Sequence, residues 1–267
     1  MPDPVLVGAG DIASCELTGG ASASGAAATA VLIENISGTV FTAGDDAYPS
    51  GTEEDFQDCY DATWGKFKDR TLPAPGNHDY VTDEGAPYFS YFGQQAGESG
   101  KGYYSTDLGA WHIIILNSNL YAEAGQAQLQ WLKDDLDSDT AICTLAIWHH
   151  PLFSSGLHGN NDYVAPLWRA LYDAGADVVI NGHDHIYERY APQDAKANAD
   201  AQGMREFIVG TGGAPLYPLL FAKPNLEVRS ATTFGVIKLT LHSSSYDWEF
   251  IPVKADGFTD TGTANCH

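Results

Sequence analysis

Residues 178–185 read Val-Val-Ile-Asn-Gly-His-Asp-His, and the fold can be worked out from this stretch. The apolar run at 178–180 predicts a short strand that is buried on both faces. Gly182 allows the chain to turn sharply after that strand, and His183 and His185 follow it. In open α/β sheets, ligands bind in the crevice beyond the carboxyl ends of the strands. The stretch therefore predicts a buried sheet with a ligand site at its edge.

Four other polar motifs follow four other predicted strands. These strands are expected at residues 5–9, 38–43, 71–75 and 141–148. The motifs after them are Gly10-Asp11, Gly44-Asp45-Asp46-Ala47-Tyr48, Gly76-Asn77-His78-Asp79 and His149-His150. Six of the 9 histidines lie in the five motifs or just after them. One such motif carries little information, but five in this order argue against a purely structural interpretation.

The side chains of these motifs are oxygen and nitrogen donors without sulfur. Such a set suits zinc, manganese or iron and does not suit a thiolate site. One carboxylate can bridge two ions, and Asp45, in the middle of the set, is the natural candidate. Two ions about 3.5–4 Å apart can clamp a phosphoryl group and generate hydroxide near neutral pH. Asp46 and Asp184 are expected to add negative charge beside the metals.

The motifs resemble those of the calcineurin-like metallophosphoesterase superfamily and, within it, the single-domain purple acid phosphatase branch. Two features carry the narrower resemblance: Tyr48 lies three residues after Asp45, and residues 182–189 read Gly-His-Asp-His-Ile-Tyr-Glu-Arg. The resemblance spans residue 8 to about residue 214. It implies an α/β fold, a four-layer αββα sandwich with two central mixed sheets flanked by helices.

The resemblance also implies a binuclear centre. Seven side chains match the family's metal ligands, and they are Asp11, Asp45, Tyr48, Asn77, His149, His183 and His185. One ion would be held by the tyrosine with Asp11, Asp45 and His185. The other would be held by the remaining three side chains, with Asp45 shared. The family expects Fe(III) at the tyrosinate site and a divalent ion, Fe, Zn or Mn, beside it.

Two histidines match the outer-sphere residues of the family, His78 and His158, which orient phosphate and assist the leaving group. His150 occupies a position that is not usually histidine, and the strand alignment favours its neighbour His149 as the ligand. We therefore treat His150 as a second-shell candidate. Asp79 is another: it could orient the His78 imidazole, or it could be a solvated loop residue.

The expected reaction is hydrolysis of a phosphate monoester, in which a metal-bound hydroxide attacks phosphorus and His78 or His158 protonates the leaving oxygen. A phosphodiesterase or nucleotide hydrolase on the same centre is the alternative within enzymes. The alternative outside enzymes is a non-catalytic metal- or phosphate-binding protein. Loss of an acid/base histidine would indicate that class, and both histidines are present here.

The charge balance limits the classes of molecule that the protein is expected to bind. There are 13 Lys and Arg against 35 Asp and Glu, a net charge of −22. Such a surface repels polyanions and argues against a general basic patch for nucleic acid. It also repels a small phosphate ester, unless metal ions reverse the sign locally. The expected partners are therefore a small phosphate ester and its product, inorganic phosphate. No run approaches the roughly 18–20 apolar residues of a membrane span.

The four cysteines, Cys15, Cys59, Cys143 and Cys266, contain no Cys-x-x-Cys pair, which argues against a thiolate zinc site. Their even number indicates two disulfides and an oxidising compartment, although buried free thiols remain the alternative. From their places beside the motifs and in the tail we predict Cys15–Cys59 and Cys143–Cys266. We interpret the chain as the mature domain of a secreted or periplasmic protein, with its targeting signal replaced by Met1.

The remaining pattern predicts helices at 21–35, 124–137 and 163–174, and a hairpin at 102–107 and 111–117. Strands are expected at 206–210, 234–241 and 246–252. Residues 256–267 are expected to form a loose tail tethered by Cys266. Since no linker is evident, we expect residues 1–267 to form a single catalytic domain.

Overall fold

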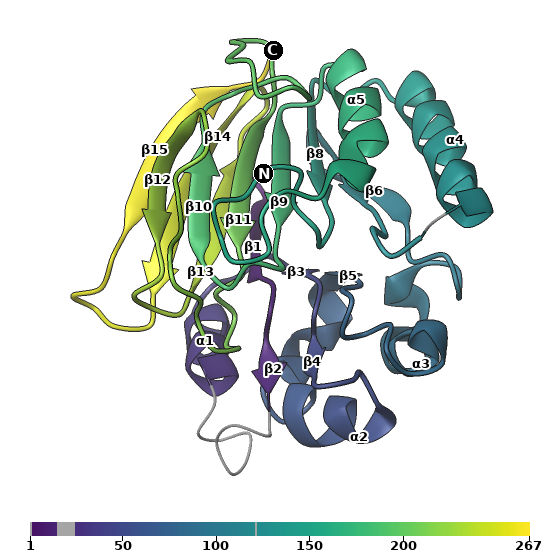
Figure 1. The fold of residues 1–267 in the computed structure, drawn as a ribbon, viewed down its shortest axis with the longest axis vertical. Coiled ribbons are helices and arrows are strands. Elements are labelled where there is room, and N and C mark those ends of the chain that lie inside the picture. The colour runs from purple at the N-terminus through teal and green to yellow at the C-terminus, as the bar shows by residue number, and fades with distance from the viewer. Residues whose placement is uncertain (1, 15–24, 121) are drawn as a thin grey trace.

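Two β-sheets packed face to face form the centre of the computed structural model, which describes residues 2–14, 25–120 and 122–267 (Figure 1). The six-stranded sheet has the order β15 (Asp260–Asn265), β14 (Ser245–Pro252), β13 (Gly235–Leu241), β1 (Val5–Ala9), β3 (Thr39–Ala43), β5 (Thr71–Ala74). The seven-stranded sheet has the order β12 (Leu226–Ser230), β10 (Tyr187–Tyr190), β11 (Arg205–Val209), β9 (Val178–Asn181), β8 (Cys143–Ile147), β7 (Trp111–Ile115), β6 (Tyr104–Leu108). A two-stranded ribbon joins β2 (Ala13–Ser14) to β4 (Ala47–Tyr48).

The five strands that precede the polar motifs run parallel to one another within each sheet. In the first sheet β1, β3 and β5 are parallel, and in the second β7, β8, β9 and β11 are parallel. The carboxyl ends of the two groups meet, because the backbone N–H of Gly10, after β1, donates to the Val209 carbonyl at the end of β11 (2.8 Å). All five motifs are therefore delivered to one place where the sheets adjoin.

The central strands β7, β8 and β9 of the seven-stranded sheet are buried on both faces, which explains their apolar runs. In β8, Leu145 and Ile147 belong to the core between the two sheets, while Ala146 faces a second core. In β9, Ile180 and Val179 divide in the same way. A charged residue at any of these positions would lose its water without gaining a partner.

Helices cover the outside of the sandwich. The second core joins the seven-stranded sheet to α4 (Ala122–Ser138) and α5 (Ala165–Asp173), through Leu132 and Trp168 among others. On the other side α1 (Gly25–Glu34) packs against β13. The shorter helices and turns are α2 (Glu53–Asp55), η2 (Phe56–Tyr60), η3 (Trp64–Arg70), η4 (Asp83–Gly85), α3 (Ala86–Phe92), η5 (Gly93–Ala96) and η6 (Asp162–Val164). The predicted sandwich of two mixed sheets flanked by helices is confirmed.

Most predicted elements are present. The hairpin is β6 and β7, paired antiparallel, and the predicted helices at 124–137 and 163–174 are α4 and α5. The predicted helix at 21–35 is α1 from residue 25 onward, and residues 21–24 lie outside the described residues. Nothing in the sequence predicted β10 or β12, because their charged side chains obscure the alternation of apolar and polar residues that marks a strand. Within the described ranges, no helix has both the length and the apolar character needed to cross a membrane.

The prediction of a loose tail was wrong. Residues 260–265 form β15, which pairs antiparallel with β14 along the edge of the six-stranded sheet. Its Gly, Thr and Asn residues do not resemble a strand, but Gly262 lies against the Trp248 ring, where a Cβ would collide. Asp260 also holds the strand in place, since its carboxylate accepts hydrogen bonds from Tyr187 Oη (2.7 Å) and Arg189 Nε (2.7 Å).

The disulfide Cys143–Cys266 is present, as predicted, and it links β8 of one sheet to the end of β15 of the other. The two cysteines are 123 residues apart in sequence. In the chain-entropy model a loop of this length contributes about 5 kcal/mol. Cys15 lies outside the described residues, so the pairing Cys15–Cys59 stays a prediction.

His112, on β7, gives stability a dependence on pH. Its Nδ1 lies 2.9 Å from Asp107 Oδ1 and its Nε2 lies 2.9 Å from Asp135 Oδ2. The hydrogen bond to Asp135 raises the pKa of His112 to about 9 against the opposing effect of burial, and Asp107 and Asp139 add to the rise. An unfolded histidine has a pKa of about 6.5. The protonated form therefore favours folding below that pH, and this contribution disappears as the pH rises through 9.

We expect His112→Gln to lower the free energy of unfolding by about 1–2 kcal/mol at pH 6, a value reduced for the exposure of Asp107. Because the stabilising proton is lost, wild type and variant should differ much less at pH 9.5. Urea denaturation of both proteins at the two pH values measures the difference. An equal deficit at pH 6 and pH 9.5 would contradict the role of the charge.

Candidate metal centre

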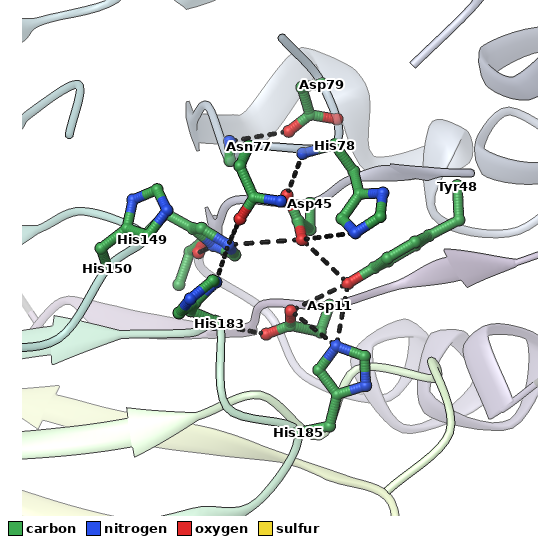
Figure 2. A network of polar contacts seen from close by, with 12 residues as sticks. Asp11, Asp45, Tyr48, Asn77, His78, Asp79, His149, His150, His183 and His185 are labelled. Carbon is green, nitrogen blue, oxygen red and sulfur yellow. Dashed lines mark hydrogen bonds and ion pairs between the residues drawn. The ribbon is translucent and has the colours of Figure 1, made fainter. Parts of the chain in front are cut away.

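Five side chains from five strand ends converge in the centre of the site: Asp11, Asp45, Asn77, His149 and His183 (Figure 2). Three of them have left-handed backbone conformations, with φ of 59° at Asp11, 54° at Asp45 and 71° at His183. Each such residue costs about 1–3 kcal/mol, and strain of this kind clusters at functional sites. The turns bring side chains of both sheets into one space.

Glycines let the loops approach this closely. A Cβ on Gly182 would lie 2.7 Å from the Ala43 carbonyl oxygen and 2.7 Å from Asp11 Oδ2. A Cβ on Gly76 would overlap the backbone nitrogen and side chain of Asp45. Larger residues at these two positions would push the strand ends apart.

The first group of donors surrounds the phenol oxygen of Tyr48. That oxygen lies 2.9 Å from Asp11 Oδ1, 3.0 Å from Asp45 Oδ2 and 3.1 Å from His185 Nε2. Asp11 Oδ1 and His185 Nε2 are themselves 3.2 Å apart. All four side chains are buried. This group coincides with the four residues that the sequence assigned to one ion.

The second group surrounds His149 Nε2. This atom lies 3.1 Å from Asn77 Oδ1, 3.2 Å from His183 Nδ1 and 3.3 Å from Asp45 Oδ2. Asp45 Oδ2 thus faces both groups, as a bridging carboxylate would. The structure brings together all seven side chains that the sequence singled out.

Backbone carbonyls fix the orientation of three imidazoles. Nδ1 of His149 donates to Ala43 O (2.8 Å), and Nδ1 of His185 donates to Pro215 O (2.7 Å). His78 is held in the same way by Pro49 O (2.6 Å). A carbonyl can only accept, so Nδ1 carries the proton and Nε2 faces the acidic centre. Metal-binding histidines are typically oriented in this way.

The ionisable groups are strongly perturbed. Burial alone would raise the pKa of Asp45, but the charge and hydrogen bond of His149, with His78 beside it, hold that pKa well below its usual value. Burial lowers the pKa of His149, yet Asp45 and then Asp11 raise it to about 9. Burial, then Asp11 and Asp45, raise the pKa of Tyr48 well above 10. A phenol placed beside two carboxylates ionises only if a cation binds its oxygen.

Comparison with known proteins assigns the family. The profile of the calcineurin-like phosphoesterase family matches residues 10–187, a range that includes all seven donors. The chain belongs to this family. Its relatives include purple acid phosphatases. Purple acid phosphatase 15 of Arabidopsis thaliana is 28% identical over 169 residues, covering 56% of this chain and 32% of the relative. Probable purple acid phosphatase 20 of the same plant is 33% identical over 169 residues, covering 59% and 39%.

Solved structures show the same fold. A purple acid phosphatase of yellow lupin, Lupinus luteus, has a TM-score of 0.76 at 21% identity, covering 98% of this chain and 53% of that one. GAP50, described as the anchor in the inner membrane complex of Plasmodium, has a TM-score of 0.77 at 16% identity, covering 100% and 90%. By contrast, the sequence matches to the two Arabidopsis phosphatases span less than two fifths of the length of those proteins.

In this member of the phosphoesterase family, His150 lies behind the donors. Its Nδ1 is 2.8 Å from Ser118 Oγ, and its ring packs 4.4 Å from the His183 ring. Burial, with the charge of His149, lowers the pKa of His150 to about 3. His149, His150 and His183 could also share an ion by proximity alone. The hydrogen bond to Ser118 occupies one nitrogen of His150. Because Nε2 of His149 faces the other donors, His149 is favoured over His150 as the metal ligand.

Asp79 matches neither interpretation drawn from the sequence. It is fully buried, and its carboxylate accepts hydrogen bonds from the backbone N–H groups of Gly76 (2.8 Å) and Asp46 (3.0 Å). The imidazole of His78 bonds to Pro49 instead. Asp79 thus ties the second motif loop to the third. Burial, then Asp45, raise the pKa of Asp79 to about 7.

Two groups beside the centre could not be found from the sequence. The Tyr217 ring stacks on His185, with centroids 3.9 Å apart and planes 9° apart. Ser118 contacts His150 as described above. Neither belongs to a motif, and both reach the site from distant loops. His158 is placed beside the centre as predicted, with its exposed ring 4.3 Å from that of His183.

We expect His149→Ala to lose far more bound metal than His150→Ala, because His149 Nε2 touches three other donors and His150 is bonded to Ser118. After dialysis, elemental analysis should show the His150 variant retaining most of its metal and the His149 variant losing roughly one ion of two. Equal losses, or the reverse order, would show that the two histidines are exchanged. Circular dichroism of both variants controls for unfolding.

Proposed function

We propose that the protein hydrolyses phosphate monoesters at a centre of two metal ions. The observation that carries this proposal is the pair of donor groups that share Asp45 Oδ2. Two carboxylates, a phenol, an amide and three imidazoles converge without a lysine or arginine among them. Buried carboxylates need a compensating charge, and this donor set is the one that bound cations use. Membership of the phosphoesterase family supports the same conclusion.

The residues fit two ions of unequal character. Asp11, Tyr48 and His185, with Asp45, would hold Fe(III), since a phenolate favours a strong Lewis acid. Asn77 and its two histidine neighbours, again with Asp45, would hold a divalent Fe, Zn or Mn ion. When bound, the ions would supply positive charge to the phosphoryl oxygens and activate water as the nucleophile. Two such ions also make the pocket positive although the chain carries −22.

Two histidines outside the donor groups would handle the substrate. The Nδ1 of His78 donates to Pro49 O, and its Nε2, 3.9 Å from Asp45 Oδ2, would donate a hydrogen bond to a phosphoryl oxygen in the imidazolium form. His158 is exposed, and its ring lies 4.3 Å from that of His183. An accessible imidazole there can carry a proton to the leaving oxygen. The substrate would thus be oriented by His78 and its product alcohol released past His158.

We also propose a domain organisation, a substrate size and a compartment. Residues 1–267 would form one catalytic domain, and the substrate would be a small ester instead of a nucleic acid. The Cys143–Cys266 disulfide supports action in an oxidising compartment, outside the cell or in a periplasm.

Hydrolysis of 4-nitrophenyl phosphate and bis(4-nitrophenyl) phosphate, measured side by side, tests the proposal that the protein hydrolyses phosphate monoesters. Faster turnover of the diester would favour the phosphodiesterase alternative, and turnover of neither would favour a binding protein.

We expect Asn77→Ala and His183→Ala each to lower kcat/KM by roughly 100-fold or more, because each removes one donor from the second group. Bound metal should fall in parallel by elemental analysis. Asn35→Ala, on an exposed amide at the end of α1, is the matched control and should behave as wild type. Full metal content and near-normal turnover in both site variants would overturn the ligand assignment.

We expect the iron-loaded protein to be coloured and Tyr48→Phe to bleach it. A phenolate on Fe(III) absorbs visible light, and phenylalanine cannot supply one. The variant should keep its iron by elemental analysis, because Asp11, Asp45 and His185 remain. An iron-loaded wild type without a visible band would show that Tyr48 only packs beside the metal.

A further inference from the structure

Asp184 lies between the two histidines of the last motif, yet its hydrogen bonds come from one other loop. The carboxylate is fully buried. Its Oδ1 accepts the backbone N–H of His158 (2.8 Å), and its Oδ2 accepts those of Gly159 (3.3 Å) and the hydroxyl of Ser154. The carboxylate of Asp184, which we expected to add charge beside the metals, therefore binds the loop of residues 154–159.

The loop is pressed directly onto this carboxylate. A Cβ on Gly156 would overlap the carboxyl group of Asp184. The Ser154 hydroxyl, besides donating to Asp184, accepts the N–H of Gly156 (3.0 Å). Three backbone or hydroxyl donors around one buried carboxylate make a fixed turn, since charge-assisted hydrogen bonds are about twice as strong as neutral ones.

Two more buried carboxylates hold the start of the same loop. Glu188, on β10, accepts the N–H of Ser155 (3.0 Å) and also its hydroxyl. Glu206, on the adjacent strand β11, accepts the N–H of Phe153 (3.4 Å). Burial raises the pKa of both glutamates. Burying carboxyl groups is costly unless they are hydrogen-bonded, and here the bonds serve the loop.

The imidazole of His158 has no comparable support of its own. Its ring lies 4.3 Å from that of His183 and 5.4 Å from that of Tyr217. Within residues 2–14, 25–120 and 122–267, neither ring nitrogen of His158 has a hydrogen bond. The place of this ring is therefore set by its backbone, which Asp184 holds.

We infer that Asp184 is a positioning residue that holds His158 where it can protonate the leaving oxygen. This inference rests on the proposed function. In the step concerned, water oxygen forms a bond to phosphorus, the ester P–O bond breaks, and its electron pair goes to the leaving oxygen. The proton of the His158 imidazolium joins that oxygen to give the alcohol. Such a transfer requires heavy atoms within about 2.6–3.2 Å, so a loose loop would lose it.

Two esters separate proton donation from every other role of the loop. An alkyl phosphate releases a strongly basic alkoxide, which needs a proton, whereas 4-nitrophenyl phosphate releases a weakly basic phenolate, which does not. We expect Asp184→Asn to lower kcat on the alkyl phosphate about 10-fold more than on the aryl phosphate. His158→Ala should show the same bias, and adding Asp184→Asn to it should cause no further loss. Metal content should stay unchanged.

Asp177→Asn is the matched control. Asp177 is also a buried carboxylate that accepts two backbone N–H groups, from Thr144 (2.9 Å) and His267 (3.0 Å), but it lies at the opposite end of β8. This variant should hydrolyse both esters as wild type does. If Asp184→Asn fails to fold, Ser154→Ala removes one hydroxyl donor and should show the same bias at about 3-fold.

Equal losses on the two esters in the folded variant, or losses that add to those of His158→Ala, would overturn the inference. The wild-type protein distinguishes this failure from that of the proposed function. If the metal-loaded wild type hydrolyses both esters and the variant shows no bias, only the role of Asp184 is rejected. If the wild type hydrolyses neither ester, the proposed function is rejected and the inference with it.

Discussion

The Asp45 carboxylate lies where the two sheets adjoin, and both donor groups depend on it. Its Oδ1 accepts the backbone N–H of His78 (2.7 Å), which fixes the carboxyl plane. Its Oδ2 then faces Tyr48, on the β2–β4 ribbon, at 3.0 Å and His149, after β8 of the seven-stranded sheet, at 3.3 Å. A second carboxylate, Asp11, adds like charge in a medium of low dielectric constant, where repulsion is strong. The arrangement needs compensating positive charge, which His149 supplies in part and bound cations would supply in full.

Such a centre requires the two sheets to keep their relative position within a fraction of an ångström. The apolar core between the sheets stabilises their contact but does little to fix their relative position, since apolar contacts are non-directional. Two directional links supplement it. The Cys143–Cys266 disulfide joins β8 to the end of β15, and Asp260 on β15 accepts hydrogen bonds from Tyr187 and Arg189 on β10. The tail expected to be loose is thus part of what keeps the donors aligned.

The convergence of these side chains could be predicted from the sequence because each motif is local: a buried strand, a glycine and a polar side chain lie within a few residues. Prediction failed where the partner is distant. Asp184 meets the N–H of His158 across 26 residues, and Tyr217 reaches His185 from another loop. Buried acids such as Asp79 look like surface residues in a chain with 35 Asp and Glu. The strand β15 was missed because its pairing with β14, not its composition, makes it a strand.

The acidic residues around the centre differ in where their carboxyl groups point, and this difference determines the charge that a phosphate ester would meet at the site. Asp11 and Asp45 face the donors and would be neutralised by metal ions. Asp79 and Asp184 instead turn their carboxylates toward backbone N–H groups of neighbouring loops. Burial, then the charge of Asp79, raise the pKa of Asp46 well above its usual value, which favours the neutral form of this carboxyl. Asp79 and Asp184 therefore build the loops of the centre, and the charge of bound metal ions would remain available to the substrate.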